Sequence, residues 1–146
     1  MARLLVVDDE DEVREVLVRR LSREGYAVTA AESAAAARQA LAASDGFDVV
    51  VTDMSMEQAD SGLDVLRDAM AHDVFTEVIV LTAYGNVQNA VESMRRGAFD
   101  YLEKNLPGVD VLELLIIKVG QAVERRRAAV NTLRRLDTRV SRMTPP

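Results

Sequence analysis

The run Val49-Val50-Val51-Thr52-Asp53 decides the fold of this chain, because it is a short β-branched stretch that ends directly in a carboxylate. Three other short apolar runs also end at polar side chains: residues 3–7 before Asp8 and Asp9, residues 77–82 at Thr82, and residues 100–103 before Lys104. Helical stretches lie between these runs, which predicts parallel strands joined by right-handed crossovers. The carboxyl ends of such strands share one edge of the sheet, so these side chains should meet in one pocket.

The same alternation continues along the whole chain. We expect strands at residues 3–7, 26–30, 47–52, 77–82 and 100–103, and helices that begin at Asp11 or a neighbouring cap, after a Ser33 cap, near Leu63, near Asn86 and near Val109. Five strands alternating with five helices predict an α/β fold, a flavodoxin-like doubly wound (βα)5 sandwich with parallel strand order 2-1-3-4-5 and an extended last helix.

Composition excludes several classes of function. At 146 residues the chain suits one α/β domain. It has no cysteine, which excludes disulfides, thiolate metal sites and thiol catalysis. No signal peptide is recognisable and no segment approaches about 20 consecutive apolar residues, so we expect a cytoplasmic protein that does not span a membrane.

Charge is distributed unevenly along the chain, whose net charge is −6. From Gln121 onward seven arginines face only Glu124 and Asp137, so this segment carries +5 and residues 1–120 carry −11. We therefore expect an acidic globular domain at residues 1–120 and a helical extension or linker at residues 121–146 with a separate task.

The last helix carries a heptad seam into this extension. Its members recur at alternating spacings of three and four: Leu112, Leu115, Val119, Ala122, Arg126, Ala129, Leu133, Leu136, Val140 and Met143. We expect a coiled-coil-like extension that forms a homodimer, with a solvated linker or a helix folded against its own domain as alternatives. The extension has no aromatic residue and no recognisable reading motif, so direct nucleic-acid binding is not expected.

The pocket would bring together Asp8, Asp9 and Asp53. Two carboxylates about 4 Å apart repel by about 4 kcal/mol at an effective dielectric constant of about 20, so three of them need a cation or a raised pKa. Mg²⁺ (or Mn²⁺) fits, because it prefers carboxylates, waters and a phosphoryl oxygen. Asp9 and Asp53 would be direct ligands, Asp8 would lie nearby or act through water, and the backbone carbonyl of Ser55 could add a further ligand.

With metal bound, a carboxylate can act as a nucleophile on phosphorus, and Asp53 is the candidate because it stands alone at the end of the central strand. Lys104 would supply positive charge, and Thr82 a hydroxyl, to the phosphoryl oxygens. Each of these residue types is common at a strand end, and only their occurrence together, each at the end of a predicted parallel strand, indicates this chemistry. Neither GxxxxGK[ST] nor GxGxxG occurs, which argues against a nucleotide site, and the single histidine, His72, is expected to lie on the surface.

Residues 1–120 resemble the receiver domain of bacterial two-component response regulators. The resemblance rests on four runs: Leu4-Leu5-Val6-Val7-Asp8-Asp9-Glu10, Val49-Val50-Val51-Thr52-Asp53-Met54-Ser55-Met56, Val80-Leu81-Thr82-Ala83-Tyr84-Gly85 and Gly97-Ala98-Phe99-Asp100-Tyr101-Leu102-Glu103-Lys104. It implies that a histidine kinase or histidine phosphotransfer protein phosphorylates Asp53. Thr82 and Tyr101 would then move as switch residues and reshape the face formed by the fourth helix, fifth strand and fifth helix. Ser55 and Tyr84 would tune the lifetime of the acyl phosphate.

Two loops depart from the pattern of this family. The family usually has a proline after the lysine, often with a cis bond, whereas Asn105 follows Lys104 here. We expect a trans bond at this position, because a non-proline cis bond costs about 2.5–4 kcal/mol. After Asp53, Glu57 replaces a common proline and Gly62 arrives one residue late, so this loop should be longer and more acidic than usual.

The expected function is a phosphorylation-dependent signalling switch, which is no enzyme beyond its own phosphotransfer and dephosphorylation. A phosphatase similar to the haloacid dehalogenases would need an acid where Ser55 stands. A phosphorylation-independent interaction or dimerisation module would usually have lost an acid, the lysine or the hydroxyl. The 26 residues after Gly120 are too few for an output domain, so the chain is expected to be a single-domain regulator or part of a longer one.

Overall fold

A computed structural model describes residues 1–83, 86–105 and 107–143. Strands and helices alternate in it as β1 (Arg3–Val7), α1 (Asp11–Arg23), β2 (Ala27–Ala31), α2 (Ala34–Ala43), β3 (Val49–Asp53), α3 (Ser61–His72), β4 (Glu77–Thr82), α4 (Val87–Arg95), β5 (Asp100–Glu103) and α5 (Val111–Met143). The predicted elements are therefore present, with ends shifted by about two residues at most.

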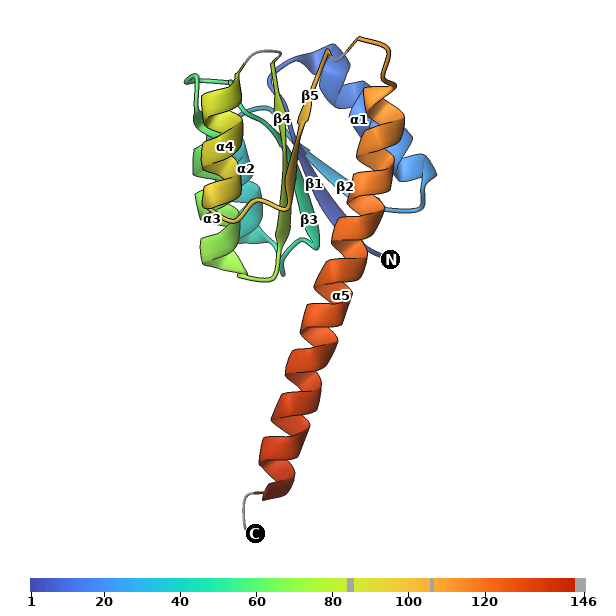
Figure 1. The fold of residues 1–146 in the computed structure, drawn as a ribbon, viewed down its shortest axis with the longest axis vertical. Coiled ribbons are helices and arrows are strands. Elements are labelled where there is room, and N and C mark those ends of the chain that lie inside the picture. The colour runs from blue at the N-terminus through green and yellow to red at the C-terminus, as the bar shows by residue number, and fades with distance from the viewer. Residues whose placement is uncertain (84–85, 106, 144–146) are drawn as a thin grey trace.

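The strands form one parallel sheet in the order β2-β1-β3-β4-β5, which confirms the predicted topology. β3 lies at its centre, with Val49 opposite Leu4 of β1 and Asp53 opposite Leu81 of β4. Helices α1 and α5 cover one face, and α2, α3 and α4 cover the other (Figure 1). The carboxyl ends of β1, β3 and β4 consequently lie side by side, as ligand sites in doubly wound sheets require.

Each central strand supplies two hydrophobic cores. Leu5 and Val7 of β1 pack into the core beneath α2 and α3, whereas Leu4 and Val6 pack into the core beneath α1 and α5. Every residue of β3 is buried. This double burial explains why the strands are continuous apolar runs without polar alternation.

The starts of α1 and α2 are built differently. Helix α2 begins as predicted, because the Ser33 hydroxyl accepts a hydrogen bond from the Ala36 N–H at 2.9 Å. The expected side-chain cap of α1 is wrong: its N-cap is Glu10, no side chain caps it, and Asp11 is its first helical residue. The Asp8 carboxylate instead accepts the Glu10 N–H at 2.9 Å. A residue of the expected pocket therefore also shapes the turn into α1.

Helix α5 belongs to the domain over its first half and projects from it over its second half (Figure 1). Leu115, Val119, Ala122 and Val123 are buried in the core that α5 shares with α1. Beyond them Leu133, Leu136, Val140 and Met143 are 42, 50, 62 and 80% exposed. The predicted seam is therefore divided in two: its first part packs on the sheet of its own domain, and its second part is exposed on the helix surface.

Arg126, the residue that interrupts the heptad pattern, joins α5 to the amino-terminal edge of the sheet. Its Nε lies 2.8 Å from Oδ1 of Asp48, just before β3, and its Nη2 lies 3.0 Å from Oδ2 of Asp73, just after α3. Asp48 also accepts the backbone N–H of Arg3 at 2.7 Å. The polar position in the seam is thus explained by a contact within the chain.

Within the described parts of the chain, none of the helices has the length and hydropathy needed to cross a bilayer.

Candidate phosphorylation and metal site

Three carboxylates meet where β1 and β3 end. Asp8 and Asp9 follow β1, Asp53 is the last residue of β3, and an oxygen of each lies within 4.8 Å of the others. Asp8 and Asp53 are buried, with exposures of 0 and 6%, whereas Asp9 is exposed. The predicted grouping is confirmed by this geometry, which leaves one side of the cluster open to solvent.

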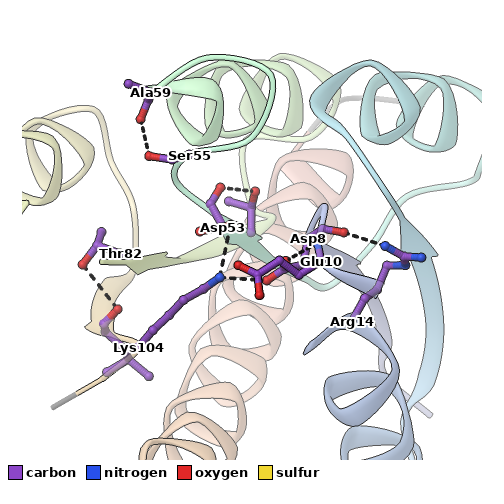
Figure 2. A network of polar contacts seen from close by, with 10 residues as sticks. Asp8, Glu10, Arg14, Asp53, Ser55, Ala59, Thr82 and Lys104 are labelled. Atoms are coloured by element: carbon purple, nitrogen blue, oxygen red, sulfur yellow. Dashed lines mark hydrogen bonds and ion pairs between the residues drawn. The ribbon is translucent and has the colours of Figure 1, made fainter. Parts of the chain in front are cut away.

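Lys104 joins the cluster from the end of β5. Its Nζ lies 3.1 Å from Oδ2 of Asp8 and 3.1 Å from Oδ2 of Asp53, so one ammonium bridges two carboxylates (Figure 2). Its backbone N–H donates to the Thr82 carbonyl at 2.8 Å, which fixes the start of the loop to β4. Burial opposes the charge of Lys104, but the carboxylates of Asp53 and Asp8 outweigh it and raise the pKa of the lysine. Lys104 is therefore a fixed positive charge within the site.

Asp53 is held in an environment that disfavours its ionised form. Burial raises the pKa of Asp53, and the charges of Asp8 and Asp9 add to this, while Lys104 acts in the opposite direction. A group with a raised pKa in a cleft is typical of a functional site. A further cation beside the cluster would relieve the remaining carboxylate repulsion.

The donor set fits a hard divalent cation. Three carboxylates with oxygens in mutual reach, one of them exposed, provide the oxygen ligands and the open side that Mg²⁺ requires to keep water molecules. One Lys104 ammonium can balance only part of the charge of three carboxylates.

Thr82 and Tyr101 lie around this centre without touching it. The Thr82 hydroxyl is buried and donates a long hydrogen bond, 3.5 Å, to the Leu102 carbonyl of β5. It therefore points toward β5, and a side-chain rotation would be needed to reach a group on Asp53. Tyr101 is 36% exposed, with its ring at the surface of β5. The bond between Lys104 and Asn105 is trans, as expected.

The β3–α3 loop, residues 54–60, borders the site above Asp53. Ser55 is exposed, and its hydroxyl donates to the Ala59 carbonyl at 2.7 Å (Figure 2). The glycine at position 62, at the start of α3, is required for steric reasons, because a Cβ there would lie 2.8 Å from the Asp53 carbonyl oxygen and from Cα of Met54. Tyr84, the other residue expected to tune lifetime, lies outside the described residues.

One side chain near the site was not identified from the sequence, and a second was noted only for its charge. Arg14 of α1 donates to the Asp8 carbonyl at 2.9 Å and pairs with Asp11, which secures the β1–α1 turn (Figure 2). The i, i+3 spacing of Asp11 and Arg14 is the signal that could have suggested it. Glu57 accepts the backbone N–H groups of Ala34 and Ala35 at 2.9 and 3.1 Å, and the first of these bonds lowers the pKa of Glu57. His72 is exposed at the end of α3, as predicted.

Comparison with known proteins identifies the family of this chain. The family model of the response regulator receiver domain matches residues 4–116. The chain is 38% identical over 119 residues to the regulatory protein AtoC of Escherichia coli, covering 82% of this chain and 25% of AtoC. It is 38% identical over 122 residues to the transcriptional regulatory protein FixJ of Azorhizobium caulinodans, covering 84% of this chain and 57% of FixJ. The chain thus spans about a quarter to three fifths of these relatives.

Solved structures show the same relationship. A response regulator receiver domain protein from Clostridium thermocellum superimposes with a TM-score of 0.79 at 31% identity, over 88% of this chain and 99% of that one. NtrX from Brucella abortus gives a TM-score of 0.78 at 28% identity, over 90% of this chain and 29% of NtrX. A parallel sheet of this order with an aspartate cluster and a lysine at its carboxyl edge defines a receiver fold. The chain belongs to the response regulator receiver domain family of two-component signalling proteins.

Proposed function

We propose that this protein is a phosphorylation-dependent signalling switch in which Asp53 is the phosphoacceptor. The observation that carries the proposal is the bridge from Lys104 to Asp53 and Asp8 beside an exposed Asp9. An oxygen of Asp53 attacks the phosphorus of a phosphohistidine on a histidine kinase or phosphotransfer protein. A P–O bond to Asp53 forms, the P–N bond breaks, and the imidazole leaves. We expect this exchange to take place in the cytoplasm.

Asp8, Asp9, Asp53 and the Ser55 carbonyl would hold Mg²⁺ or Mn²⁺, which when bound neutralises charge on the transferring phosphoryl group. Lys104 stabilises the same developing charge from the other side, because it already lies 3.1 Å from Asp53. The chain's own contribution is therefore two fixed sources of charge neutralisation around one carboxylate.

Thr82 and Tyr101 would carry the response outward. Thr82 rotates from its long bond with Leu102 toward a phosphoryl oxygen, and Tyr101 turns inward from its exposed position. The face that would change contains the exposed apolar side chains of Val87, Val91 and Ile117. Phosphorylation would bias an equilibrium between two arrangements of this face through its different contacts with each.

The test is phosphorylation by acetyl phosphate with Mg²⁺, read by intact mass, with Asp53→Ala as the control. One added phosphoryl group in the wild type and none in the variant is the expected result. An unmodified wild type that still binds Mn²⁺ would contradict the proposal and favour the alternative, an interaction module that works without phosphorylation.

We also propose that the extension beyond Arg126 pairs two copies of the chain. The heptad spacing continues beyond Arg126 in Ala129, Leu133, Leu136, Val140 and Met143. The last four of these side chains are 42–80% exposed, although the same seam is buried earlier in α5. Residues 1–120 would then form the receiver domain and residues 121–146 the segment that reaches its partner. Leu136→Glu should convert a dimer to a monomer in light-scattering measurements while leaving Asp53 phosphorylation intact, and Arg134→Glu, outside the seam, should not. A wild type that stays monomeric at high concentration would refute the pairing.

A further inference from the structure

The exposed part of the β3–α3 loop is held chiefly by hydrogen bonds. Met54 is buried and Met56 packs against the hydrophobic core, but Ser55 and residues 57–60 are exposed. These exposed residues have no apolar packing to fix their shape. Their position must therefore depend on the polar contacts that they make.

Apart from hydrogen bonds within the loop, such as that from the Ser55 hydroxyl to the Ala59 carbonyl, those contacts come from both flanking helices. On one side the two carboxylate oxygens of Glu57 accept the N–H groups of Ala34 and Ala35, the first two residues of α2, at 2.9 and 3.1 Å. On the other side Asn89 of α4 donates to the Ala59 carbonyl at 3.4 Å. The Glu57 contact is the shorter, is bidentate and joins a carboxylate to a helix N-terminus, so it is the stronger of the two.

The N-terminus of α2 is almost fully satisfied by this arrangement. The Ser33 hydroxyl accepts the Ala36 N–H, and the Glu57 carboxylate accepts the N–H groups of Ala34 and Ala35. The first turn of a helix leaves its N–H groups without partners in the helix, and here a residue distant in sequence supplies two acceptors. Glu57 therefore joins the loop that follows the phosphoacceptor strand to a helix that packs on the same face of the sheet.

We propose that Glu57 is a positioning residue of the metal site. It fastens the β3–α3 loop to α2 and thereby restrains the backbone two residues earlier, which carries the proposed metal ligand, the Ser55 carbonyl. This inference deepens the proposed function, on which it rests for the identity of the site. Through the Ser55 carbonyl, Glu57 sets the affinity for Mg²⁺ and, at limiting metal, the rate of Asp53 phosphorylation.

The experiment compares three variants by Mn²⁺ binding, measured from the free Mn²⁺ signal in electron paramagnetic resonance. Glu57→Asp keeps the charge but is one methylene too short to reach both N–H groups, and Glu57→Gln keeps the length but loses the charge and one good acceptor. The matched control is Glu32→Gln, which removes an exposed carboxylate, beside the Ser33 cap, that makes no hydrogen bond within the described parts of the chain. Phosphorylation by acetyl phosphate is then timed at low and saturating Mg²⁺.

Both Glu57 variants should bind Mn²⁺ about tenfold more weakly than Glu32→Gln, the lower end of what loss of an indirect metal-site contact costs. Their phosphorylation should be slow at low Mg²⁺ and recover at saturating Mg²⁺, which a merely structural role would not produce. Wild-type affinity in Glu57→Asp, or equal weakening in Glu57→Gln and Glu32→Gln, would overturn the proposal. Failure of the wild type to take up phosphate would refute the proposed function instead, because the Mn²⁺ comparison does not depend on phosphorylation.

Discussion

Replacing Arg126 by alanine should destabilise the domain, although this residue lies far from the phosphorylation site. The substitution removes the ion pairs with Asp48 and Asp73, at 2.8 and 3.0 Å. It leaves two carboxylates at the amino-terminal edge of the sheet without their cation. Arginine and alanine are both good helix formers, so the helix itself should be little affected.

The size of the effect follows from the exposure of the three side chains, which is 17% for Arg126, 31% for Asp48 and 27% for Asp73. Exposed pairs contribute about 0–1 kcal/mol, whereas removing one partner of a fully buried pair costs about 3–5 kcal/mol. These side chains lie between the two limits, and Nη1 of Arg126 is buried without a hydrogen-bond partner among the described residues, which reduces the gain from keeping the arginine. We therefore expect a loss of about 2 kcal/mol, or a fall in Tm of about 4–8 °C for a chain of this size.

Urea unfolding followed by circular dichroism measures this loss, with Arg134→Ala as the matched control. Arg134 lies two turns further along α5, its side chain is exposed, and its loss should change stability by less than about 0.5 kcal/mol. Both variants should be compared at one protein concentration, since dimerisation would make stability depend on concentration. Equal stability of the two variants would contradict this prediction, because it would show that the contact between α5 and the sheet edge contributes nothing to the free energy of unfolding.

Three further predictions concern other parts of the fold. Gly62→Ala should cost about 1–3 kcal/mol in thermal unfolding, because the added Cβ would lie 2.8 Å from the backbone of Asp53 and Met54, and an unchanged melting curve would contradict that contact. Burial raises the pKa of Glu77, so its protonated form favours folding; this contribution is complete below the unfolded pKa and is lost as pH rises through the folded pKa. Glu77→Gln should therefore gain stability relative to the wild type as pH rises from about 4, near the unfolded pKa, through the folded pKa, and a constant difference in urea melts would contradict this. Mg²⁺ should raise the Tm progressively as its concentration increases above Kd, because the free energy of unfolding gains about 2.7 kcal/mol at a hundredfold excess over Kd, and Asp9→Asn should reduce the rise. If neither Mg²⁺ nor EDTA changes the Tm of the wild type, binding of Mg²⁺ at the carboxylates is excluded.

Much of the site could be predicted because it depends on where strands end. In a parallel sheet the carboxyl ends of all strands share one edge, so Asp8, Asp53 and Lys104, which lie at or just after strand ends, had to reach that edge. The direction of the Thr82 hydroxyl toward Leu102 was not predictable in this way. A rotamer depends on the space and acceptors around it, and these come from β5, 20 residues away.

The sequence by itself therefore determined the elements, their order and the residues at the carboxyl edge, because hydrophobic periodicity and turn chemistry are local properties of the chain. The tertiary structure alone decided what each surface contacts. It divided one continuous heptad seam at Arg126 into a half that packs on the sheet and a half that is exposed, and it placed Glu57 on the N-terminus of α2. Periodicity reveals that a face is apolar, or that a carboxylate is available, but the partner of either is fixed only when distant segments are packed together.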